Sequence, residues 1–112
     1  MATWSEEGWI HVGRSGSCEE LPRGELRWAK VVEFEGVIGP MPVDREFPRV
    51  HNIDGRASEH AHEWWGLPKL RHLTLRYTSP EQVGQLAGYR GEWTREGILI
   101  STRSIPGQVN LT

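Results

Sequence analysis

The sequence predicts a single small α+β domain over residues 1–112, in which a mainly antiparallel β-sheet carries one or two short helices on one face. The 112 residues suit one domain and leave no room for two. Two segments alternate apolar and polar residues with the period of a half-buried strand. Two other segments have helix start and stop signals, so helices would complete the core on one side of the sheet.

The N-terminal third predicts two strands joined by a loop. Residues 9–12 mix aromatic and β-branched side chains between two glycines, which is typical of a short strand. Residues 13–25 are punctuated by glycine and proline and predict a loop. Residues 26–35 form the strongest strand pattern, with Lys30 as an exception on the apolar face. That apolar face consists of Leu26, Trp28, Val32 and Phe34.

Residues 37–57 predict a long irregular loop. Pro40, Pro42 and Pro48 oppose both helix and strand, and Asp54–Gly55 is a turn signal. The apolar residues within this loop predict that it packs against the rest of the domain. Loops of this length are uncommon in compact domains and are often functional.

The C-terminal half predicts a short helix, a strand, a second helix and a hairpin. Ser58 as a cap and Gly66 as a stop favour a helix over residues 58–65. Residues 70–77 alternate as a strand. Ser79–Pro80 begins a helix that runs to about residue 87, and residues 92–103 form a hairpin.

Composition excludes some classes of function. The formal net charge is -2, from 13 basic and 15 acidic residues, which argues against a general nucleic-acid binder. No segment approaches the ~20 apolar residues that span a bilayer, and residues 1–13 contain no signal-peptide pattern, so we expect no membrane partner. Cys18 is the only cysteine, so no internal disulfide can form and a cytoplasmic location is expected.

The histidines offer one candidate metal site. Along a helix over residues 58–65, His60 and His62 would point in nearly opposite directions, which rules out an ion shared by that pair. Glu59, His62 and Glu63 would share a face and, together with His51, could ligate zinc, iron or manganese. We favour the simpler interpretation, a solvated helix face with a histidine–glutamate contact.

His72, Thr74 and Arg76 form a second constellation, because alternation places them on the polar face of one strand. If a helix or loop covered this face, His72 could act as acid or base and Arg76 could bind an anion. The simpler interpretation, which we favour, is a polar sheet face paired across strands to Glu33 or Glu35.

Adjacent Trp64 and Trp65 cannot both face one core from a regular element, because they diverge by about 100° on a helix and point oppositely on a strand. One of them is therefore either an exposed binding anchor beside arginine or is covered by the loop over residues 37–57.

These observations favour a non-catalytic module that binds another protein and needs no cofactor, comparable in class to small inhibitors, antitoxins or immunity proteins. The alternative is a small enzyme or metal-dependent protein that uses the histidine-rich region 51–72, with His72 and Arg76 as catalytic residues and a small ligand as partner. The predicted binding residues are Trp64, Trp65, Arg76, His72, Glu33 and Glu35.

Overall fold

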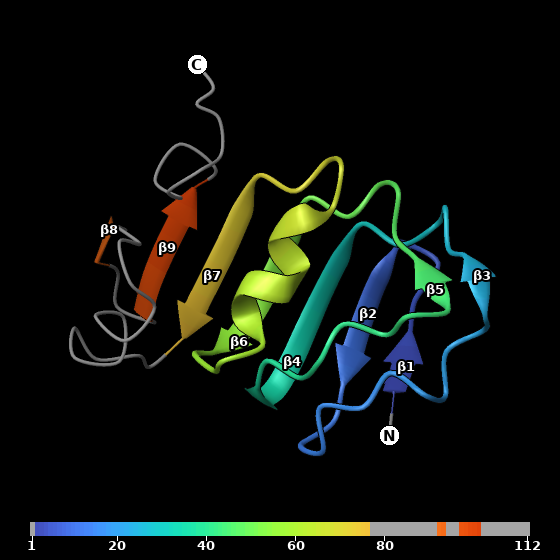
Figure 1. Cartoon of the computed structure of the whole chain (residues 1–112), viewed down its shortest axis with the longest axis horizontal. Coiled ribbons are helices and arrows are strands. Elements are labelled where there is room, and N and C mark those ends of the chain that lie inside the picture. The colour runs from blue at the N-terminus through green and yellow to red at the C-terminus, as the bar shows by residue number, and fades with distance from the viewer. Residues whose placement is uncertain (1, 77–91, 94–96, 102–112) are drawn as a thin grey trace.

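The computed structural model describes residues 2–76, 92–93 and 97–101, and in these residues strands predominate (Figure 1). One sheet contains seven strands in the order β1-β2-β4-β6-β7-β9-β8, and a second, two-stranded sheet contains β3 and β5. The strands are β1 (Ala2–Trp4), β2 (Trp9–Val12), β3 (Gly24–Glu25), β4 (Val31–Val37), β5 (Arg45–Glu46), β6 (Asn52–Arg56), β7 (His72–Arg76), β8 (Glu92–Trp93) and β9 (Gly97–Ser101), and the helical element is the 3-10 helix η1 (Ala61–Gly66).

The predicted mainly antiparallel α+β fold is wrong. The four central strands β2, β4, β6 and β7 are parallel to one another, and only the pairings that involve β1, β8 and β9 are antiparallel. Each connection between central strands passes over the same side of the sheet, where Figure 1 shows β3, β5 and η1. The chain therefore winds as a short solenoid-like coil with one central strand per turn.

A sequence repeat underlies the coil. Each of three turns begins with an apolar residue whose carbonyl accepts a hydrogen bond from the N–H three residues later. The repeat has four positions per turn: this first residue, the residue three positions later, the residue three positions after that, and the residue two positions further on. Eleven of the twelve positions in the three turns are buried apolar side chains, and the twelfth is Gly55. The three turns read Leu26-Ala29-Val32-Phe34, Phe47-Val50-Ile53-Gly55 and Leu67-Leu70-Leu73-Leu75.

The strand register stacks these repeats into columns. Ile10 pairs with Val32, Val32 with Ile53, and Ile53 with Leu73, and all four side chains are fully buried. Each apolar residue thus packs on the equivalent residue of the next coil, which explains why a chain with so little helix still buries a continuous core.

The repeat explains why the predicted strand over residues 26–35 begins too early. Residues 26–30 form a turn, and β4 begins only at Val31. Lys30, the exception in the period-two pattern, lies between Ala29 and Val32, two buried positions of the repeat that are three residues apart. Its N–H donates to the Gly8 carbonyl at 2.7 Å. The prediction for residues 9–12 is confirmed, because β2 has the same bounds.

The predicted loop over residues 37–57 is also wrong, because it contains β5 and the central strand β6. The Asp54–Gly55 pair that suggested a turn lies inside β6. Gly55 is required there by packing: a Cβ at this position would lie 2.8 Å from Ile38 Cγ1 and 3.0 Å from Phe34 Cβ. The Ile38 side chain and the Phe34 Cβ occupy the space that a side chain at Gly55 would need.

The remaining predictions have mixed outcomes. The helix predicted over residues 58–65 is the 3-10 helix η1, which starts three residues later and follows a turn in which the Ser58 hydroxyl accepts from the His60 N–H. The predicted strand over residues 70–77 is largely confirmed by β7, and the hairpin is confirmed by the antiparallel pairing of β8 with β9.

The helix predicted over residues 79–87 lies outside the described residues. No helix in the described part of the chain is long and apolar enough to cross a membrane.

Candidate functional site

The central strands expose one face on the side opposite η1, and we call it the outward face. Because side chains alternate along strands, the residues between the core positions point to this side. Strand register arranges them in two rows that cross β2, β4, β6 and β7 in that order. The first row is Trp9, Val31, Asn52 and His72, and the second row is His11, Glu33, Asp54 and Thr74.

Cross-strand polar contacts hold the β6–β7 half of this face. Arg76 at the end of β7 forms an ion pair with Asp54 on β6, and both side chains are largely screened from solvent. The Thr74 hydroxyl donates to Asn52 Oδ1 at 3.1 Å. These side chains are therefore fixed before any partner arrives, which lowers the entropy cost of binding.

Arg76 also reaches beyond β6. Pairing between β4 and β6 is irregular from Glu33 to Val37, the stretch that contains Phe34. The Arg76 guanidinium donates to that carbonyl. The arginine thus connects three adjacent strands on the outward face.

Asp54 is the electrostatically perturbed group of this face. Burial raises the pKa of the Asp54 carboxyl, the positive charge of Arg76 opposes the shift, and the nearby negative charge of Glu33 adds to it. The charge of Glu33 therefore faces the Asp54 carboxylate across the β4–β6 pair.

The β2–β4 half of the outward face is apolar at its start. Trp9 is 44% exposed, and its register neighbour Val31 is only 4% exposed although Val31 does not belong to the inward core cluster. The burial of Val31 must therefore come from outward-face neighbours. Trp9 provides a large, partly covered aromatic surface next to charged residues, which is the composition of a binding hot spot.

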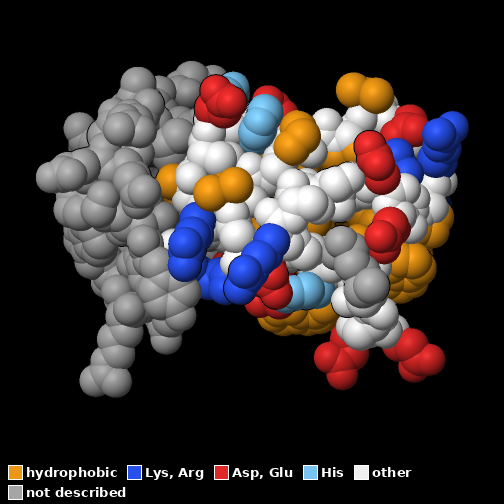
Figure 2. Space-filling model, turned by 90° about the horizontal axis from the view of Figure 1, so that it is seen from below, with side chains coloured by type: hydrophobic (Ala, Val, Ile, Leu, Met, Phe, Trp, Pro, Cys, Tyr) orange, Lys and Arg blue, Asp and Glu red, His pale blue; other side chains and the backbone are white. Residues whose placement is uncertain are grey.

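Charged side chains continue to the edge where the parallel strands end. Arg14 Nε lies 3.0 Å from Glu35 Oε2, and both side chains are exposed. Arg56 and Arg76 end β6 and β7 at the same edge. Viewed from this edge, Figure 2 shows acidic and basic side chains interleaved near the centre, with hydrophobic side chains gathered toward β1.

The structure brings four of the six predicted binding residues to this side of the molecule: Glu33, Glu35, His72 and Arg76. Trp64 and Trp65 lie on the opposite side and are 0% and 6% exposed, so neither is an exposed anchor. Trp64 stacks edge-on against Phe34 and donates from Nε1 to the Gly39 carbonyl at 2.8 Å, so the segment predicted as a loop does cover it. Sequence reasoning predicted the strand Trp9–Val12 between Gly8 and Gly13 but assigned neither of its faces, so it missed Trp9.

The alternative catalytic pair does not converge. His72 and Arg76 share a face of β7, but four residues of strand span about 13 Å. Arg76 is engaged by Asp54 and the Phe34 carbonyl. The helical element that could have enclosed an acid–base site, η1, packs on the other face of the sheet.

The alternative metal set gains no geometric support. Among residues 2–76 and the described parts of the hairpin, no three His, Cys, Asp or Glu side chains are placed to hold one metal ion. The histidine–glutamate contact forms instead between His60 Nδ1 and Glu63 Oε2, at 2.9 Å. This hydrogen bond, with a second one from the Met41 N–H, lowers the pKa of Glu63. Metal binding by His51, Glu59, His62 and Glu63 remains a prediction.

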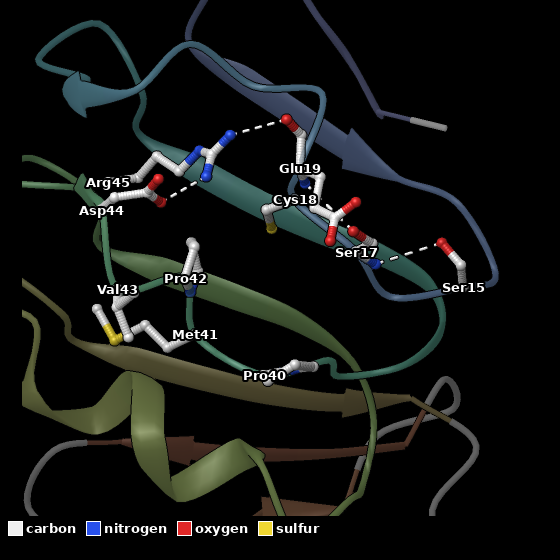
Figure 3. Close-up of a pocket in the computed structure, with 10 residues that line it drawn as sticks. All are labelled: Ser15, Ser17, Cys18, Glu19, Pro40, Met41, Pro42, Val43, Asp44 and Arg45. Atoms are coloured by element: carbon white, nitrogen blue, oxygen red, sulfur yellow. Dashed lines mark hydrogen bonds and ion pairs between the residues drawn. The ribbon is translucent and has the colours of Figure 1, made fainter.

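A hollow of about 410 Å³ lies away from the outward face, between the segments 15–19 and 40–45 (Figure 3). Cys18 lines it and is buried, and burial raises the pKa of its thiol to about 11 despite the nearby positive charge of Arg45. The thiol is therefore protonated near neutral pH and a poor nucleophile. The Arg45 guanidinium is occupied by the Glu19 and Leu21 carbonyls at 2.7 and 2.9 Å. This hollow offers shape but no activated group.

Comparisons with protein-family models, with curated proteins and with solved structures found no match for this chain.

Proposed function

We propose that this chain is a non-catalytic module that binds another protein through the outward face of its parallel sheet. The observation that supports the proposal most directly is the exposed Trp9 at one end of a polar network that cross-strand contacts already fix in place. A rigid face with one aromatic anchor and mixed charges can bind a protein without large rearrangement.

The arrangement of the coil adds a second reason. Each turn contributes one residue to each outward row, so the face extends across four strands with regular spacing of about 4.8 Å. Solenoid-like proteins generally use such extended surfaces for recognition rather than enclosed pockets. The buried thiol in the hollow and the separated His72 and Arg76 give no comparable support for catalysis.

The test is affinity capture of a tagged chain from its native cells, followed by cross-linking and mass spectrometry, with Trp9→Ala compared against Trp4→Ala. Trp4 is a matched control because it is 48% exposed and its register partner, Ile10, points inward, so Trp4 lies on the other side of the sheet. We expect Trp9→Ala to weaken the binding of a stoichiometric partner by about 2 kcal/mol or more, and Trp4→Ala to leave that partner bound.

His72→Ala provides an independent variant on the same row, three strands away from Trp9. If correctly folded Trp9→Ala and His72→Ala variants both still capture the partner, the outward face is not the binding surface. Circular dichroism of each variant confirms folding before capture.

A further inference from the structure

Trp9 and Glu33 are diagonal neighbours on the outward face. Trp9 pairs in register with Val31, and Glu33 is two residues further along β4 on the same side. Diagonal positions on adjacent strands lie roughly 7–8 Å apart, within the reach of long side chains. The indole and the carboxylate therefore lie within reach of one another on the side of the sheet where Val31 is covered.

Glu33 is the uncompensated acid of this face. Arg76 neutralises Asp54, and Arg14 neutralises Glu35. Within the described residues, no ion pair or hydrogen bond involves the Glu33 carboxylate, which is half-buried. Its negative charge also contributes to the raised pKa of Asp54, so a positive charge placed beside Glu33 would relieve an existing repulsion.

We propose that the space between Trp9 and Glu33 binds the guanidinium group of an arginine on the partner protein, an inference that rests on the proposed function. A guanidinium stacks flat on an indole through cation–π attraction, and its planar fork donates two hydrogen bonds to a carboxylate. The two groups it requires are the two that the outward face leaves unsatisfied: an exposed aromatic ring and an unpaired carboxylate. A lysine ammonium could satisfy the charge but not the stacking and the fork together.

The experiment titrates ¹⁵N-labelled chain with Nα-acetyl-arginine amide and records the indole and backbone N–H signals. We expect saturable shifts at the Trp9 indole and around residues 31–33, with a dissociation constant on the order of 1–10 mM for so few contacts. Nα-acetyl-citrulline amide, which has the same shape without the charge, should cause no saturable shift at Trp9.

Variants separate the two contributions. Glu33→Gln should lower the affinity for the arginine derivative about tenfold, because it removes the charge from the hydrogen-bonded group while keeping the shape of the side chain. Trp9→Leu should abolish saturation. Glu46→Gln, at the exposed position of β5, is the matched control for charge, and Trp4→Leu is the matched control for an exposed tryptophan; both should bind as the original chain does.

Four results would overturn the inference: no saturable binding of the arginine derivative, equal shifts with citrulline, saturable binding that does not map to Trp9, or arginine binding unchanged in Glu33→Gln. This failure is distinguishable from failure of the proposed function. A partner that is captured through Trp9, while the arginine derivative does not bind, leaves the binding module intact and rejects only the arginine.

Discussion

The two faces of the central strands differ in what fixes their side chains. On the inward face, equivalent apolar residues of successive coils stack in columns, as Ile10, Val32, Ile53 and Leu73 do. On the outward face, the rows mix apolar, polar and charged residues and even pair the two acids Glu33 and Asp54, and individual contacts such as Arg76 with Asp54 hold the side chains. The repeat therefore builds the scaffold, and departures from the repeat build the surface that we propose for recognition.

The largest test of this difference compares two tryptophans. Trp64→Ala should lower the free energy of unfolding by about 3–5 kcal/mol, because it removes a fully buried ring that contacts both Phe34 and Phe47. Trp9→Ala should cost only about 1 kcal/mol, because its ring is 44% exposed. Urea unfolding followed by circular dichroism measures both. Equal losses would mean that Trp9 belongs to the core and the two faces do not differ as described.

An intermediate effect should appear in the pH dependence of Asp54→Asn. The folded-state pKa of Asp54 is raised by burial, so the native state binds more protons than the unfolded state between the two pKa values, and stability falls as pH rises through that window. At neutral pH the charged Asp54 is a cost. Asp54→Asn removes this pH-dependent loss, so the stability of the variant relative to the original chain should rise from acidic to neutral pH.

Asp44→Asn is the control with the opposite sign. The hydrogen bond from Arg45 lowers the pKa of Asp44, so the ionised carboxylate stabilises the fold at neutral pH and this contribution is lost as pH falls. Chemical denaturation of both variants between acidic and neutral pH measures the two trends. Parallel trends for Asp54→Asn and Asp44→Asn would contradict the electrostatic description of the outward face.

The smallest expected effect concerns the exposed edge of the outward face. Arg14→Ala removes the ion pair with Glu35, whose side chains are 89% and 48% exposed. Solvent screens such a pair, so the free energy of unfolding should change by less than about 0.5 kcal/mol. Thermal melts at low and high salt check this. A loss above about 1 kcal/mol would show that Arg14 and Glu35 also organise the scaffold.

Local patterns predicted some elements and not others, for identifiable reasons. The pattern predicted the bounds of β2 and the presence of β7, whose observed range His72–Arg76 is shorter than the predicted 70–77. β6 was missed because Asp54 and Gly55 resemble a turn when they are considered alone. Only the neighbouring Phe34 and Ile38 explain a glycine at that point of a central strand.

The same limit applies to the candidate site. Alternation along β7 placed His72 and Arg76 on the polar side of the sheet, and the structure agrees. The role of Arg76 was not predictable, because its partners Asp54 and the Phe34 carbonyl belong to strands that the sequence did not align with β7. The burial of Trp64 likewise depended on where Gly39 and Phe47 would lie.

By itself the sequence determined the course of β2 and most of β7, the hairpin of β8 and β9, and the polar side of β7. Those features depend on residues close together in the chain, whose periodicity acts directly on backbone conformation. The tertiary structure alone decided that the central strands are parallel, that Gly55 lies within a strand, and that Trp9 rather than Trp64 or Trp65 is exposed. Those outcomes depend on residues about 20 positions apart stacking from one coil to the next, a distance over which local propensity has no effect.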